Sequence, residues 1–164
     1  MSALARKICM LGDFGVGKTS LVSRFVRNTF SDKYLTTVGV KTDTKLVELP
    51  QRRVKLVLWD IAGKDVLDGL KLTYLRGSTG LVMVADGTRA PTLHSAAQLL
   101  RQARGEIGEV AAVLLVNKFD LFDRWEVAPS QLAELRRAMP LFETSALSGE
   151  SVEEAFTALA ERLP

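Results

Sequence analysis

The sequence predicts an α/β fold: an open, mostly parallel sheet with helices on both faces. Two runs, 81–85 and 110–116, are apolar without alternation, as expected for strands that are covered on both sides. Stretches with helical periodicity lie between and after these strands, and a glycine-rich loop follows the first strand. Ligands of such sheets bind at the carboxyl ends of the strands. Polar residues that directly follow a strand are therefore candidates for a functional site.

The first half of the chain begins with a short buried strand at residues 7–11. After the glycine loop, apolar residues from Leu21 to Val26 recur at helical spacing. Residues 40–46 alternate between apolar or neutral and charged side chains, which is typical of an exposed edge strand. Pro50 breaks that run, and a strand over 54–59 follows. These two strands are expected to form an antiparallel hairpin.

The second half alternates strands with helices. Helical periodicity appears over 93–103, 132–139 and 152–163, and the apolar positions in each segment are interpreted as core-facing. No internal repeat, low-complexity segment or linker indicates a second domain. We therefore expect residues 1–164 to form one domain, a size that buries a substantial core.

Composition narrows the class of protein. The single cysteine, Cys9, excludes an internal disulfide framework, and its place in an apolar strand predicts a buried side chain. The net charge of +3 is spread along the chain, which argues against a nucleic-acid-binding protein. Because no run of about eighteen apolar residues occurs, we expect a cytoplasmic protein. The chain stops at Leu163-Pro164 with no cysteine nearby, so no lipid anchor is expected.

Residues 12–19, Gly-Asp-Phe-Gly-Val-Gly-Lys-Thr, fit the pattern G-x-x-x-x-G-K-[ST] of a phosphate-binding loop. Glycines let the backbone N–H groups approach phosphates, and the N-terminus of the following helix adds positive potential. Lys18 is expected to reach the β- and γ-phosphates, and the Thr19 hydroxyl is expected to ligate Mg²⁺. The residues of this segment predicted to contact a nucleotide are Asp13, Phe14, Gly15, Val16, Gly17, Lys18, Thr19 and Ser20.

Two further motifs stand at strand ends. Asp60 follows the strand over 54–59 and can hold the Mg²⁺ shell. Residues 117–120, Asn-Lys-Phe-Asp, follow the apolar strand over 110–116. The Asp120 carboxylate can accept hydrogen bonds from N1–H and the 2-amino group of guanine, a pattern that adenine lacks. Asn117 and Lys118 are expected to brace that pocket. Three motifs in this order indicate a guanine-nucleotide site.

Together with Thr37, residues 59–63 and residues 144–146, these motifs resemble the Ras superfamily of small GTPases over essentially the whole chain. Residues 34–40 and 74–80 are similar in particular to the Rab branch. The resemblance implies the P-loop NTPase fold, with a six-stranded, mostly parallel sheet and one antiparallel edge strand. It also implies a molecular switch that binds GTP or GDP with Mg²⁺ and hydrolyses GTP.

The resemblance assigns roles to further residues. It implies that Phe30 packs on the guanine edge, that Tyr34 covers the phosphates, and that Gly63 donates its N–H to the γ-phosphate. The base-contacting set becomes Phe30, Asn117, Lys118, Asp120, Leu121, Ser145, Ala146 and Leu147. The implied Mg²⁺ ligands are Thr19, Thr37 and Asp60. The implied catalytic set is Lys18, Thr37, Gly63 and Lys64.

By the same likeness, residues 31–41 and 61–77 are the segments that GTP orders and GDP loosens. Effector and regulatory proteins would bind there. Taken alone, residues 28–37 are polar and show no period, which predicts a loop.

Two residues depart from the family pattern near the γ-phosphate. Lys64 occupies the place of the usual Gln, and an ammonium has no acceptor for a hydrogen of the attacking water. We therefore expect slow intrinsic hydrolysis. Phe14 replaces a small residue, and its ring either intrudes on the catalytic space or points away as packing. Ile61 and Leu147 also differ from the usual residues, without removing a ligand.

Two competing functions remain. A pseudo-GTPase that holds nucleotide constitutively and serves as a scaffold is favoured by Lys64 and Phe14, whereas Thr19, Thr37 and Asp60 favour a switch. An ATP-dependent enzyme sharing the same loop is disfavoured by Asp120.

Overall fold

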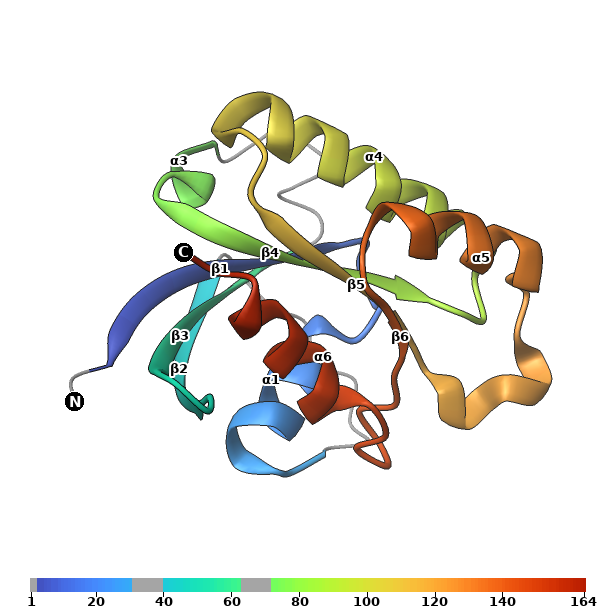
Figure 1. Ribbon diagram of the computed structural model, residues 1–164. Coiled ribbons are helices and arrows are strands. Elements are labelled where there is room, and N and C mark those ends of the chain that lie inside the picture. The colour runs from blue at the N-terminus through green and yellow to red at the C-terminus, as the bar shows by residue number, and fades with distance from the viewer. Residues whose placement is uncertain (1–2, 31–39, 63–71) are drawn as a thin grey trace.

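The computed structural model describes residues 3–30, 40–62 and 72–164. Six strands within these ranges form one sheet, in the order β2-β3-β1-β4-β5-β6 (Figure 1). Every neighbouring pair is parallel except β2 and β3. The predicted sheet, with its antiparallel edge strand, is confirmed. The strand bounds are β1 Leu4–Gly12, β2 Val40–Glu48, β3 Arg53–Ile61, β4 Ser78–Asp86, β5 Ala111–Asn117 and β6 Leu141–Glu143.

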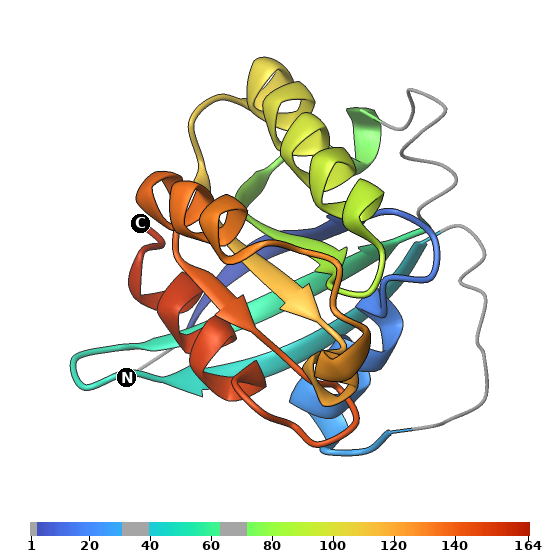
Figure 2. The ribbon, with the colours of Figure 1, turned by 90° about the vertical axis from the view of Figure 1, so that its right-hand side faces the viewer.

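Helices cover both faces of the sheet. Helices α1 and α6 lie on one face, and α3, α4 and α5 lie on the other (Figures 1 and 2). A short 3₁₀ segment, η1, follows β5. The bounds are α1 Lys18–Arg27, α3 Leu72–Leu75, α4 Ala90–Ile107, η1 Phe119–Arg124, α5 Pro129–Ala138 and α6 Val152–Glu161. No helix among the described residues is both long and apolar enough to span a bilayer.

The apolar strands alternate between two cores. Ile8 and Met10 of β1 belong to the cluster under α1 and α6, whereas Cys9 and Leu11 belong to the cluster under α4 and α5. Alternate side chains of a strand point to opposite faces, so a strand buried on both faces needs apolar residues throughout. Cys9 is completely buried, which confirms the position expected from the sequence, and this burial raises the pKa of its thiol.

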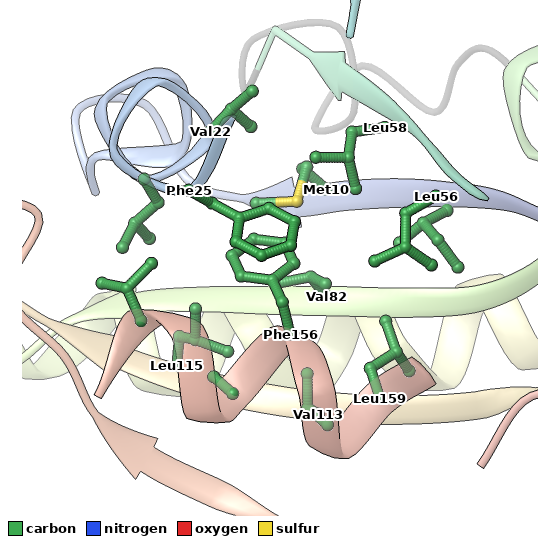
Figure 3. Packing of buried hydrophobic residues seen from close by; sticks show 14 of the residues in the cluster. Met10, Val22, Phe25, Leu56, Leu58, Val82, Val113, Leu115, Phe156 and Leu159 are labelled. Carbon is green, nitrogen blue, oxygen red and sulfur yellow. The ribbon is translucent and has the colours of Figure 1, made fainter. Parts of the chain in front are cut away.

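Helix α1 packs against both the sheet and α6. The rings of Phe25 on α1 and Phe156 on α6 are stacked, with centroids 4.1 Å apart (Figure 3). Both side chains are almost completely buried. Because the glycine loop leads directly into α1, this packing also sets the position of the loop.

The parallel registers bring the carboxyl ends of β1, β3, β4 and β5 to one edge. Gly12 pairs with Val84, and Asp86 pairs with Asn117. Asp60 lies at the same edge, one strand over, beside Met10. Polar residues that are far apart in the sequence therefore meet where the sheet ends.

Candidate functional site

The glycine loop runs from the end of β1 to the start of α1. Gly15 and Gly17 have φ values of 76° and 102°, a region that favours glycine. A Cβ at Gly12 would collide with the carbonyl oxygen of Val84, and one at Gly17 would collide with the side-chain amide of Asn117. The loop is thus pressed against β4 and β5. Its backbone leads into the N-terminus of α1, where N–H groups without helical partners favour an anion.

Lys18 is the first residue of α1, and its side chain folds back over the loop. Its Nζ donates to the carbonyl oxygens of Gly12 at 3.0 Å and Asp13 at 3.3 Å. Only 6% of the residue is exposed. Burial lowers the pKa of Lys18, while the charges of Asp60 and Asp13 act in the opposite direction. An anion in the loop would offset the cost of this buried ammonium.

Thr19 and Asp60 place a hydroxyl and a carboxylate together. Thr19 Oγ1 donates a hydrogen bond to Asp60 Oδ2, and Asp60 is 2% exposed at the end of β3. Mg²⁺ prefers oxygen ligands and is commonly held by few protein groups together with phosphates. The pair therefore fits the predicted cation. Thr37, the third predicted ligand, lies outside the described residues.

Asn117 joins the loop to the other end of the site. Its Nδ2 donates to the carbonyl oxygen of Val16 at 3.0 Å, and its Oδ1 accepts a hydrogen bond from Thr144 Oγ1 at 3.1 Å. Asn117 and Thr144 are both buried. The bracing role expected of Asn117 thus has a structural basis, since the amide connects the glycine loop to the segment after β6.

The segment after β6 lies against η1. Ser145 Oγ donates to Asp120 Oδ1 at 2.8 Å and accepts a hydrogen bond from the Ser148 N–H at 3.1 Å. Asp120 is exposed, whereas Ser145 and Ala146 are buried. The structure therefore brings Asp120 and Ser145, two of the residues predicted to contact the base, together, with one carboxylate oxygen held by a hydroxyl.

Arg24, on α1, holds the segment that follows β6, at Ala146 and Leu147. Its Nε donates to the Ala146 carbonyl oxygen at 2.8 Å, and its Nη2 donates to that of Leu147 at 2.6 Å. The sequence offered no signal for these contacts, because the partners are backbone atoms 122 and 123 residues away. Leu147 itself is exposed, and Leu121 and Phe30 are half-buried. Phe30 packs against the cluster under α1 and α6.

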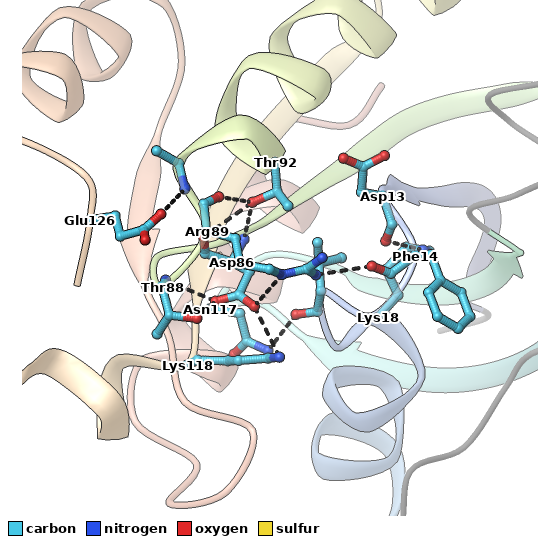
Figure 4. Close-up of polar contacts among 12 residues, drawn as sticks. Asp13, Phe14, Lys18, Asp86, Thr88, Arg89, Thr92, Asn117, Lys118 and Glu126 are labelled. Atoms are coloured by element: carbon cyan, nitrogen blue, oxygen red, sulfur yellow. Dashed lines mark hydrogen bonds and ion pairs between the residues drawn. The ribbon is translucent and has the colours of Figure 1, made fainter. Parts of the chain in front are cut away.

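Phe14 occupies the middle of the glycine loop, and 48% of it is exposed. Its ring points away from Asp86 and Arg89 (Figure 4). Ser20 follows Thr19 on α1 and is half-buried. Four other predicted site residues, Tyr34, Thr37, Gly63 and Lys64, lie outside the described residues.

Asp86 was not singled out from the sequence. It is the last residue of β4, and its Oδ2 lies 3.0 Å from Lys118 Nζ. Its place in the sequence could have identified it, because Asp86 directly follows the apolar run 81–85 in the same way that Asp60 follows the strand over 54–59 and Asn117 follows the run 110–116. Lys118 adopts a left-handed backbone conformation, with φ 73°, immediately after β5. Its side chain lies within the same polar cluster as Asp86 (Figure 4).

A glycine loop of this form between a central parallel strand and a helix is the phosphate-binding element of P-loop nucleotide-binding proteins. Comparison with protein families agrees with this class. The model of the Ras family matches residues 7–164, and the chain belongs to that family.

Individual relatives are Rab and Ypt proteins. The chain is 35% identical to Ras-related protein Rab-10 of Diplobatis ommata over 94% of this chain and 79% of that protein. It is 36% identical to GTP-binding protein YPT1 of Saccharomyces cerevisiae over 96% of this chain and 78% of that protein. It is also 36% identical to Ras-related protein RABA1a of Arabidopsis thaliana over 92% of this chain and 71% of that protein. The chain is thus a Rab-like small GTPase by descent.

Proposed function

We propose that the protein binds GTP and GDP with Mg²⁺, hydrolyses GTP, and works as a molecular switch. The observation that supports this most strongly is the hydrogen-bonded path from Val16 through Asn117 to Thr144. Ser145, the next residue, donates to Asp120 Oδ1, so the path links a loop suited to phosphates with a carboxylate suited to guanine. One rigid unit would thereby hold both ends of a guanine nucleotide.

In this proposal the phosphates lie in the glycine loop. Lys18 Nζ moves its hydrogen bonds from the loop carbonyls to the β- and γ-phosphates, and backbone N–H groups of the loop and of α1 hold the remaining oxygens. Thr19 and Asp60 hold Mg²⁺, with Thr37 as a further ligand. When bound, the cation neutralises charge on the phosphates. Thr19 would release Asp60 Oδ2 and turn its oxygen lone pair to the cation.

Hydrolysis requires in-line attack by water on the γ-phosphate, and positioning and charge stabilisation do most of the catalytic work. We assign charge stabilisation to Lys18 and to the Gly63 N–H. No side chain is needed to remove a proton from the water. Gly63 and Lys64 both lie outside the described residues.

Selection for guanine is assigned to Asp120. Ser145 donates to Oδ1, which leaves lone pairs of the carboxylate for N1–H and the 2-amino group of the base. Adenine presents an acceptor at N1 and no 2-amino group, so the carboxylate would lose both bonds.

Calorimetry on protein stripped of nucleotide tests this assignment. GDP and GTP are expected to bind in the presence of Mg²⁺, and ATP and ADP are expected to give no comparable heat. Asp120→Ala provides the matched variant and should lose guanine preference while keeping the phosphate loop. An absence of heat with both guanine nucleotides, or equal affinity for ATP, would refute the proposal.

Slow hydrolysis is a separate hypothesis that rests on Lys64. Single-turnover hydrolysis of GTP by the wild type should be little faster than by Lys64→Ala, and Lys64→Gln should be faster than both. Equal or lower activity of the Gln variant would contradict the assigned role of Lys64. Lys18→Ala serves as a control, because it removes the ammonium that is proposed to contact the β- and γ-phosphates.

A scaffold that keeps its nucleotide without turnover is the second candidate, favoured by Lys64 and by the bulky Phe14. Prolonged incubation with GTP and Mg²⁺ separates the two: conversion to GDP supports the switch, and unchanged bound GTP supports the scaffold. For either function we propose residues 31–41 and 61–77 as the surface for effector and regulatory proteins.

A further inference from the structure

The carboxylate of Asp86 is the centre of a polar cluster behind the glycine loop. Its side chain is 1% exposed. Oδ1 accepts hydrogen bonds from the Thr88 N–H at 2.8 Å and the Thr88 hydroxyl at 2.6 Å. Oδ2 lies 3.0 Å from Lys118 Nζ and 3.0 Å from Arg89 Nε. Burial alone raises the pKa of Asp86, but the bonds from Thr88, Lys118 and Arg89 outweigh it and leave the pKa lowered. A fixed negative charge therefore stands at the end of β4.

Arg89 bridges this buried charge to the glycine loop. While Nε contacts Asp86, Nη2 donates to the carbonyl oxygen of Phe14 at 2.9 Å (Figure 4). The two partners lie on separate elements, and Arg89 and Phe14 are 75 residues apart. A planar guanidinium can make both bonds at once from different nitrogens, which a lysine ammonium does less well.

The backbone of Arg89 is also held in place. Arg89 is the residue before α4, and its N–H donates to the Asp86 carbonyl oxygen at 2.9 Å. The next N–H, of Ala90, donates to Glu126 Oε1 at 2.9 Å. The hydroxyl of Thr92 donates to the Arg89 carbonyl oxygen at 2.7 Å. The guanidinium thus extends from a rigid helix start rather than from a loop.

We propose that Arg89 is a positioning residue that clamps the glycine loop at Phe14 and slows the release of bound nucleotide. This inference rests on the proposed function. In such a loop the N–H groups face the phosphates, so a carbonyl held from outside keeps the neighbouring N–H groups oriented inward. Release of phosphates requires the loop to relax, and the clamp opposes that motion.

An ordinary surface ion pair is the alternative interpretation, since the Arg89 side chain is 46% exposed. Exposed ion pairs contribute little. Two features distinguish Arg89: one partner is a fully buried carboxylate, and the other is a main-chain carbonyl of the loop itself. The bridging geometry, and not the positive charge alone, is therefore the quantity to test.

The experiment measures release of a fluorescent GDP analogue, chased with excess GDP at fixed Mg²⁺. The variants are Arg89→Ala, which removes the clamp, and Arg89→Lys, which keeps the charge without the two-pronged contact. Arg101→Ala is the matched control, because Arg101 is exposed and about three turns further along α4. Hydrogen exchange of the peptide covering residues 12–20 is recorded for each protein, with and without nucleotide, and α6 serves as an internal reference.

Because the Arg89 side chain is half-exposed, its bond to the loop is expected to contribute as an ordinary hydrogen bond does, and Arg89→Ala should speed release about three- to tenfold. Arg89→Lys should fall between this variant and the wild type, and Arg101→Ala should match the wild type. Exchange over residues 12–20 should accelerate in Arg89→Ala while exchange over α6 stays constant.

Release within twofold of the wild type in Arg89→Ala would overturn the inference, as would a wild-type rate in Arg89→Lys. If the wild type binds no guanine nucleotide, the proposed function fails by itself. Hydrogen exchange of the empty protein then still decides the clamp: faster exchange over residues 12–20 in Arg89→Ala supports it, and equal exchange overturns it.

Discussion

Replacing Asn117 with alanine should destabilise the protein and loosen both ends of the nucleotide site. The Asn117 amide donates to the carbonyl oxygen of Val16 and accepts from the hydroxyl of Thr144. Asn117 is almost completely buried, and the methyl group of alanine reaches neither partner. The buried carbonyl and the buried hydroxyl would both lose a hydrogen bond, with little access to water as a replacement.

The magnitude follows from these two bonds. Each buried polar group left without a partner costs about 1–3 kcal/mol. Asn117→Ala is therefore expected to lower the free energy of unfolding by about 2–6 kcal/mol. Thr144→Val is the matched variant, since it keeps the side-chain shape and removes only the bond to Asn117. It should cost about 1–3 kcal/mol.

Urea unfolding of nucleotide-free protein, followed by circular dichroism, measures both losses. Nucleotide release should also accelerate in Asn117→Ala, since the amide supports the loop that we propose to hold the phosphates. A loss in Asn117→Ala no greater than the loss in Thr144→Val would refute the reasoning, because it would mean that the contact with Val16 contributes nothing.

Three further outcomes are expected. Asp120→Asn should weaken GDP binding by about 100-fold and favour xanthosine diphosphate, because the 2-oxo group of xanthine accepts a hydrogen bond from the new amide. Competition against a fluorescent GDP analogue measures the affinity for each nucleotide, and unchanged GDP affinity would contradict the role of Asp120 in recognising guanine. Lys18→Met should abolish nucleotide binding. The melting temperature of the empty protein should stay unchanged or rise, because burial disfavours the charged ammonium of Lys18. A clear fall in the melting temperature would show that the buried ammonium stabilises the empty protein, contrary to this expectation. Because the pKa of Asp86 is lowered in the folded state, the ionised carboxylate stabilises the protein fully above about pH 4, and this stabilisation is lost as pH falls further through the folded-state pKa. The free energy of unfolding of Asp86→Asn should therefore fall less than that of the wild type over this acid range. Parallel plots of unfolding free energy against pH for the two proteins would contradict the stabilising role of the Asp86 carboxylate.

Much of the fold was predictable because each central strand is apolar on both faces. The runs 81–85 and 110–116 identified β4 and β5, and the alternation over 40–46 identified the edge strand β2. Strand β6, Leu141–Glu143, has only 3 residues, too few to establish a period. Its presence followed from the family resemblance alone. Helix α4 begins earlier than its apolar pattern, at Ala90, because Pro91 suits the first turn.

The site was predictable where function demands particular residues at fixed spacing. The glycine loop, Asp60 and residues 117–120 follow strand ends, and the topology brings them to one edge. Arg24 and Arg89 escaped prediction for a physical reason. Long side chains that donate to distant backbone carbonyls leave no pattern in the sequence, since any residue can supply the acceptor.

The stacked rings of Phe25 and Phe156 have a consequence for biosynthesis. Helix α1, which follows the glycine loop, is made early, whereas α6, the helix that packs on it, comes later in the chain than every described strand of the sheet. A nascent chain lacking α6 would expose part of one face of the sheet and leave α1 with the sheet as its only support among the described elements. The proposed nucleotide site is therefore expected to reach its folded form only after α6 has been synthesised, so a nascent chain that ends before α6 should bind nucleotide poorly.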